Sequence, residues 1–157
     1  MSVKDYVNRT ADLLLFHGDF PSKGEQRTTI TLFQPGTGGL LCTGVQKLAQ
    51  RLLTILLTKQ GSVQHLPDYG TTFMIDGERG TWRTVNDVSL SFYTAARDLK
   101  RQLRAAQLST DPLDEIVDTI LLTNVTLNLD QVSIRILMTT EAGTSYVFVA
   151  PISVAIK

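Results

Sequence analysis

The chain has few of the residues that build redox, metal and disulfide sites. It contains one cysteine, Cys42, and two histidines, His17 and His65, among 157 residues. A single cysteine forms no internal disulfide and suits a reducing compartment. A zinc site needs three or four ligands, which these residues cannot supply without carboxylates. The sequence therefore gives no reason to expect a metal site or a bound cofactor.

An excess of charge of one sign is also missing. Lys and Arg total 15, Asp and Glu total 15, and the formal net charge is zero. A neutral chain has no global field that would attract nucleic acid or an anionic membrane. It has no apolar run of about 18 residues, and residues 1–6 lack the order of a signal peptide. We therefore expect neither a nucleic-acid nor a membrane partner.

The composition is that of one folded domain. Hydrophobic residues make up 43% and charged residues 19% of the chain, whereas charged residues make up about 25% of a typical soluble protein. A chain of this length buries roughly 70% of its unfolded surface without disulfides. The low charge fits a protein that buries surface against partners, and it fits an ordinary globular domain equally well.

The clearest local pattern predicts a helix that begins after Thr43. Thr43 followed by Gln46 is typical of a capping box. Ile55 and Leu57 widen the apolar face, which indicates cover on two sides. The apolar residues at helical spacing are Val45, Leu48, Ala49, Leu52, Leu53 and Leu56.

The region before this helix divides into two parts. Residues 1–26 show no consistent period, and we interpret them as an N-terminal arm or extra element outside the core. Residues 27–33 alternate and are rich in β-branched side chains, which predicts a strand. Residues 34–39 are rich in glycine and predict a flexible turn. The predicted strand at residues 27–33 would begin a domain that spans residues 27–157.

A second helix is predicted over residues 85–107, roughly 34 Å long and capped by Thr84 or Asn86. Its predicted buried stripe comprises Val85, Val88, Phe92, Ala95, Ala96, Leu99, Leu103 and Ala106. The opposite side carries Arg97, Lys100, Arg101 and Arg104. These residues form either a docking face for an acidic partner or an ordinary solvated face. Among the functional alternatives we favour protein docking, because no aromatic residues interleave with the patch.

The last third of the chain predicts an antiparallel meander. Residues 116–127 and 132–139 read as strands, and residues 141–143 as a hairpin turn. Residues 146–150 and 152–156 complete a third strand, in which Pro151 marks an edge or a bulge. The predicted fold class is α+β, with two helices packed on one face of an antiparallel sheet that ends in a three-strand meander.

Few residues suggest catalysis. The glycine-rich segment 34–44 lacks the Gly-Lys-Ser/Thr ending of a phosphate-binding loop, and Cys42 lacks a flanking signature that would pair it with His65. Trp82 is the one tryptophan that could form a sugar platform. The carboxylates that merit comparison with glycosidase chemistry are Asp68, Asp76, Glu78 and Glu141. Most of them lie in turn-rich sequence, including a turn predicted at 76–80, so we predict no catalytic residue.

One segment resembles a known family. The first helix runs through residues 47–58 into a turn at Gly61 and then into Pro67-Asp68-Tyr69-Gly70-Thr71. This order resembles the small baseplate wedge protein of contractile-tailed phages, a family sometimes labelled lysozyme-like and also found in type VI secretion baseplates. The similarity spans roughly residues 27–156. The family often carries Glu-Pro-Arg before the meander, whereas residues 109–115 here read Ser-Thr-Asp-Pro-Leu-Asp-Glu.

The resemblance implies a structural subunit of a virion tail baseplate, assembled in the host cytoplasm. Its implied partners are other baseplate wedge proteins, the central hub or spike, and the tail sheath protein, in a hetero-oligomeric assembly. The C-terminal strands would resemble the handshake domain of sheath subunits and seed the sheath by strand pairing. The alternatives are a peptidoglycan hydrolase of the baseplate and a free regulatory or chaperone-like binding domain.

The resemblance and the pattern together select two sets of residues. The partner-binding set joins the basic helix face to the last strand, and it comprises Tyr146, Phe148, Ile152, Val154, Ile156, Arg97, Lys100, Arg101 and Arg104. The structural loop is predicted to fix the register of the two helices, and it comprises Gly61, Pro67, Asp68, Tyr69 and Gly70. Tyr69 would fill a gap between the helices, and Gly70 would hold a backbone angle that other residues resist.

Overall fold

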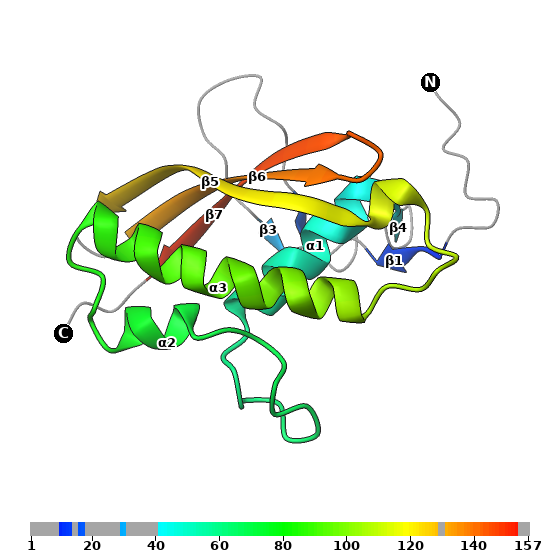
Figure 1. Cartoon of the computed structure of the whole chain (residues 1–157). Coiled ribbons are helices and arrows are strands. Elements are labelled where there is room, and N and C mark those ends of the chain that lie inside the picture. The colour runs from blue at the N-terminus through cyan, green and yellow to red at the C-terminus, as the bar shows by residue number, and fades with distance from the viewer. Residues whose placement is uncertain (1–9, 14–15, 18–28, 31–40, 129–130, 154–157) are drawn as a thin grey trace.

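The computed structural model describes residues 10–13, 16–17, 29–30, 41–128 and 131–153 (Figure 1). Four two-residue strands come first, followed by three α-helices, one 3-10 turn and three longer strands. The elements are β1 (Asp12–Leu13), β2 (Phe16–His17), β3 (Thr29–Ile30), β4 (Leu41–Cys42), α1 (Gly44–Leu57), α2 (Phe73–Glu78), α3 (Val85–Ala105), η1 (Leu113–Glu115), β5 (Val117–Asn128), β6 (Gln131–Thr140) and β7 (Ser145–Ser153). The predicted α+β fold with a C-terminal meander is confirmed.

The C-terminal sheet is antiparallel, with β6 between β5 and β7. The register of β5 on β6 shifts between Val117 and Thr119 and again between Leu122 and Asn124. Strand β7 pairs with β6 without a shift and continues through Pro151, which lies opposite Ser133. The predicted edge position of Pro151 is therefore right and the alternative of a bulge there is wrong, because a proline without an N–H fits an outer strand.

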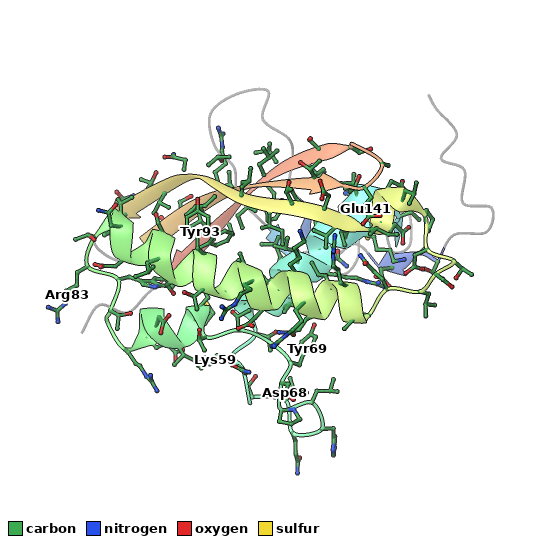
Figure 2. The ribbon with its side chains drawn as sticks, in the orientation of Figure 1. Lys59, Asp68, Tyr69, Arg83, Tyr93 and Glu141 are labelled. Carbon is green, nitrogen blue, oxygen red and sulfur yellow. The ribbon has the colours of Figure 1, made fainter. Side chains whose placement is uncertain are left out.

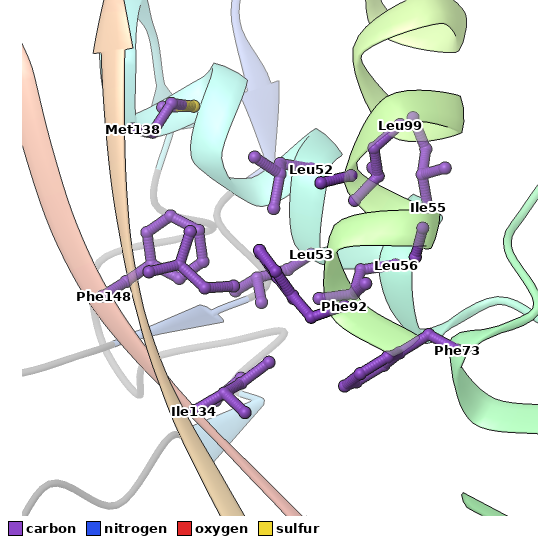
Figure 3. Packing of buried hydrophobic residues seen from close by; sticks show 14 of the residues in the cluster. Leu52, Leu53, Ile55, Leu56, Phe73, Phe92, Leu99, Ile134, Met138 and Phe148 are labelled. Carbon is purple, nitrogen blue, oxygen red and sulfur yellow. The ribbon is translucent and has the colours of Figure 1, made fainter. Parts of the chain in front are cut away.

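Helices α1 and α3 cover one face of this sheet (Figure 1). Strand β6 alternates as predicted, since Val132, Ile134, Ile136 and Met138 are buried. The opposing side chains come from the helices and include Leu52, Leu56, Phe92 and Leu99, as Figure 3 shows. The period-2 pattern of the strand and the 3.6-residue pattern of the helices thus meet in one core.

Helix α2 was not predicted, because Asp76-Gly77-Glu78-Arg79-Gly80 reads as a turn by composition. Burial of an aromatic cluster explains the difference. Phe73 is fully buried, and its ring centroid lies 4.5 Å from that of Trp82 and 6.1 Å from that of Phe92. A Cβ added at Gly77 would lie 2.8 Å from the Trp82 ring, so this glycine permits close helix–indole packing.

Helix α3 begins and ends close to its predicted bounds. Thr84 is the N-cap, and it forms a capping box with Asp87. Hydrogen bonds from Thr84 hold the pKa of the Asp87 carboxyl below its ordinary value. Val85, predicted to be buried, is 45% exposed, whereas Val88, three residues later, is fully buried. The helix ends at Ala105, two residues before the predicted end.

The N-terminus of α1 differs from prediction. Thr43 is the N-cap, but its side chain makes no capping hydrogen bond, so the predicted capping box with Gln46 is wrong. The Gly44 N–H instead donates to Glu115 Oε1 at 3.0 Å. A buried carboxylate from η1 therefore takes the place of the local cap, since it carries a full charge to the positive end of the helix.

The first described residues contact α1. Strand β1 pairs with β4, and β2 pairs with β3. Asp12 forms an ion pair with Arg51, with Oδ2 to Nε at 3.1 Å. The strand predicted over 27–33 is described only at β3, and the rest lies outside the described residues, so the domain boundary after residue 26 stays a prediction. In the described part of the chain, no helix is long and apolar enough to cross a membrane.

Candidate functional site

The loop between α1 and α2 is closed by backbone hydrogen bonds at its base. The Thr71 N–H donates to Thr58 O at 2.9 Å, and the Gln60 N–H donates to Thr71 O at 3.0 Å. Further bonds within the loop join Ser62 to Lys59 and Leu66 to Val63. Figure 1 shows the loop projecting away from the helices and the sheet. It is a compact loop whose ends lie together, a form that is frequently functional.

Gly70 occupies the position in this loop where the sequence predicted a special backbone angle. Its φ is +96°, and an added Cβ would lie 2.4 Å from Thr58 O. Its N–H donates to Gln102 Oε1 at 3.1 Å, and its carbonyl accepts from Gln102 Nε2 at 2.7 Å. Because Gln102 lies on α3 and Thr58 ends α1, the contacts of Gly70 link the two helices. That the loop fixes the register of the helices stays a prediction.

Tyr69 is half-buried and packs against the core. Burial raises the pKa of its hydroxyl, while the positive charge of Arg51 on α1 acts in the opposite direction. Gly61, Pro67 and Asp68 are exposed, and Figure 2 shows Asp68 on the projecting part of the loop. The loop thus has a base fixed to the helices and an exposed end.

A buried charge pair lies at the opposite end of α1. Lys47 Nζ donates to Glu115 Oε2 at 2.6 Å, and both side chains are almost fully buried. The same ammonium donates to Thr10 O at 3.1 Å and to Thr10 Oγ1 at 2.6 Å. With the Gly44 N–H on Glu115, both charges have specific partners, so the cluster joins the N-terminal segment, α1 and η1.

Sequence reasoning missed this cluster for a physical reason. Lys47 and Glu115 are 68 positions apart, and each has an unremarkable local context. The available signal was an acidic residue, Glu115, just before the first strand of the predicted meander. That signal does not reveal which cation the carboxylate meets, since the pairing depends on the tertiary fold.

Three of the four candidate carboxylates have structural partners, and the fourth, Asp68, is exposed on the loop. Asp76 Oδ2 accepts from Ser91 Oγ at 2.7 Å, Glu78 forms an ion pair with Lys59, and Glu141 forms one with Arg104 at 3.5 Å. Trp82, considered as a sugar platform, is 6% exposed and belongs to the core. Its place in the aromatic cluster prevents it from stacking on a sugar.

Cys42 and His65 lie at opposite ends of α1. Cys42 is buried just before the helix, with its thiol 3.9 Å from Gln50 Oε1, whereas His65 is exposed on the loop after the helix. The 14-residue helix between them is about 21 Å long. The structure therefore separates this candidate nucleophile pair. Within the described ranges, no group of three or more potential ligands could hold a metal ion.

The residues predicted for strand pairing have different surroundings. Phe148 and Ile152 are buried against the helices, and Tyr146 is half-buried, with a pKa raised mainly by burial. Their side chains are thus core contacts and not partner contacts, because they lie on the face of β7 that α1 covers. Val154 and Ile156 lie outside the described residues. Val147, on the outward face of β7, is 41% exposed and is the side chain of this strand that a partner could contact.

The predicted basic face lies on α3, opposite its buried side. Arg97 is exposed and Lys100 is half-buried. Arg101 pairs with Asp98 at 3.3 Å and Arg104 pairs with Glu141 at 3.5 Å. Both pairs are exposed, and such pairs contribute only about 0–1 kcal/mol to stability. The arginines therefore keep the ability to meet carboxylates on another molecule.

Comparison with known proteins adds no relative. The chain matches no protein-family model, and no curated protein sequence matches it. The family suggested by the helix-to-loop segment accordingly stays a hypothesis that rests on residues 47–72 and on the order of the elements.

Proposed function

We propose that this chain is a non-catalytic structural subunit of the baseplate of a contractile phage tail. In this proposal it joins baseplate wedge proteins to the hub or spike and starts the tail sheath by strand pairing. The observation that carries the proposal is the three-strand meander, in which β7 is an outer strand among the described residues and is held from one side by the helices. The loop geometry at Gly70 supports the resemblance from which the proposal started.

Strand pairing is physically suited to β7. Phe148, Ala150 and Ile152 anchor the strand in the core, so its backbone is held before a partner arrives. A partner strand then gains main-chain hydrogen bonds without the cost of ordering a loose segment.

The outward face of the sheet supports the same proposal. Leu121, Leu137 and Val147 lie in register across the three strands. Leu121 and Val147 are 47% and 41% exposed. An apolar row at a sheet edge is an aggregation hazard unless another chain covers it. A sheath strand that paired with β7 would place its own side chain beside Val147 and so shield the edge end of this row.

The proposal is tested by a charge placed on the outward face of β7. Val147→Lys leaves the buried face of the strand unchanged, and a lysine on an edge strand opposes strand addition. We expect the variant to fold, to enter the baseplate and to fail to start a sheath, as seen by electron microscopy of assembled particles. Thr126→Lys, at an exposed position of β5, is the matched control and should give sheaths of normal length. Normal sheaths on Val147→Lys particles would refute strand pairing by β7.

This substitution is preferable to removing residues 144–157. That deletion also takes Phe148, Ala150 and Ile152 out of the core, so a loss of sheath would follow from unfolding alone. Copurification of the chain with intact particles separates a baseplate subunit from a free binding domain. A chain found only in the soluble fraction of an infected cell would contradict the proposal.

A further inference from the structure

Helix α3 carries a continuous stripe of exposed residues directly opposite its buried side. At about 100° per residue, its members cluster around one direction, and the buried Val88, Phe92 and Leu99 point the other way. We define the α3 stripe as Leu90, Tyr93, Arg97, Arg101 and Arg104, all of which are exposed. From Leu90 to Arg104 the stripe is about 21 Å long.

The first half of the stripe is apolar and largely exposed. Leu90 is 72% exposed, more than any other large hydrophobic side chain that the structure describes, and Tyr93 is 52% exposed. A lone exposed leucine is ordinary, but here an aromatic residue lies one turn away on the same face. Together they form the kind of anchor that a partner buries.

The second half of the stripe is basic. Residues 97–104 include four basic residues, Arg97, Lys100, Arg101 and Arg104, and one acidic residue, Asp98, a local net charge of +3 in a chain whose total is zero. Arginines near a helix C-terminus offset its dipole, which accounts for Arg101 and Arg104. It does not account for Arg97, which has no ion-pair partner among the described residues and lies two turns before the end of α3.

We propose that the α3 stripe binds an amphipathic helix of another protein. The apolar residues of that helix would cover Leu90 and Tyr93, and its carboxylates would face Arg97, Arg101 and Arg104. A convex helix face with residues at i, i+3, i+7, i+11 and i+14 fits side-by-side helix packing. Arginine forms forked hydrogen bonds with carboxylates, which fixes the register of the two helices. The proposal does not depend on strand pairing by β7.

A nucleic-acid partner fits the stripe less well. Phosphate binding needs no apolar anchor, and its affinity rises with the number of cationic contacts. The stripe has three arginines on one side of a leucine–tyrosine pair, and the chain as a whole has no positive field. Apolar and basic residues in one line match the two faces of an acidic amphipathic helix.

The experiment uses the full chain and two synthetic helical peptides as long as α3. One peptide has a leucine stripe flanked by glutamates, and the other has lysines in place of the glutamates. We expect the acidic peptide to bind saturably in fluorescence anisotropy, at least tenfold more tightly than the basic peptide, with affinity falling as salt rises. Amide chemical shifts of the full chain should change along residues 90–104. An acidic peptide that does not bind, or that shifts other residues, would overturn the proposal.

Matched variants separate the two halves of the stripe. We expect Leu90→Asn and the double variant Arg97→Glu/Arg101→Glu each to weaken peptide binding at least tenfold, with unchanged circular dichroism. Leu66→Asn is the control for an exposed leucine, and Arg79→Glu/Arg83→Glu is the control for charge reversal; both should bind like the parent chain. Equal loss in the controls would refute a specific site. If the chain bound duplex DNA more tightly than the acidic peptide, and Leu90→Asn did not weaken that binding, the partner of the stripe would be nucleic acid and not a helix.

Discussion

The buried pair of Lys47 and Glu115 gives the sharpest stability prediction. The side chains are 2% and 5% exposed, and Nζ lies 2.6 Å from Oε2. Glu115→Gln keeps the shape and the acceptor for the Gly44 N–H, but it leaves the Lys47 ammonium without a counter-charge. Removing one partner of a buried pair costs roughly 3–5 kcal/mol. In a chain of this size we expect the melting temperature to fall by roughly 10 °C.

A double-mutant cycle tests the reasoning. Lys47→Met should also destabilise, because it leaves the Glu115 carboxylate buried without its ammonium. The double variant Lys47→Met/Glu115→Gln removes both charges, so it should lose clearly less free energy of unfolding than the two single variants together. The same cycle on the exposed pair Lys59 and Glu78 is the control, with an expected coupling below about 1 kcal/mol. Urea unfolding measures all of these values, and strictly additive losses at Lys47 and Glu115 would refute the buried-pair account.

Two further predictions concern the loop and the carboxylates. Gly70→Ala should lower the free energy of unfolding by roughly 1–3 kcal/mol more than Gly61→Ala does. Both glycines have a positive φ, but only at Gly70 would the new Cβ meet a backbone oxygen. Equal melting temperatures of the two variants would contradict this close approach. The triple variant Asp68→Asn/Asp76→Asn/Glu78→Gln should keep its fold and support particle assembly. The parent protein should not clear a suspension of cell walls between about pH 4 and 8, and clearing lost in the folded triple variant would establish a hydrolase instead.

Periodic elements were predictable from the sequence because their signals are local. The apolar spacing of α1 and α3 and the alternation of β6 each reflect one buried face, and the structure confirms them. The glycine angle at Gly70 was predictable for the same reason, since it depends on a turn within a few residues. These signals were sufficient to predict the fold class.

Features that depend on distant contacts were not predictable in this way. Helix α2 forms in turn-like sequence because Phe73 and Trp82 are buried together. The cap of α1 comes from Glu115, although a local capping box was present in the sequence.

The cap that Glu115 provides to α1 has a consequence for synthesis on the ribosome. The carboxylate follows Gly44 by 71 residues, so at about 5–20 residues per second it is made roughly 4–14 s later. During that interval the first turn of α1 lacks its acceptor, and the Lys47 ammonium remains in water. The helix therefore reaches its final state only when the start of the meander arrives, which couples completion of the N-terminal half to translation of the C-terminal half.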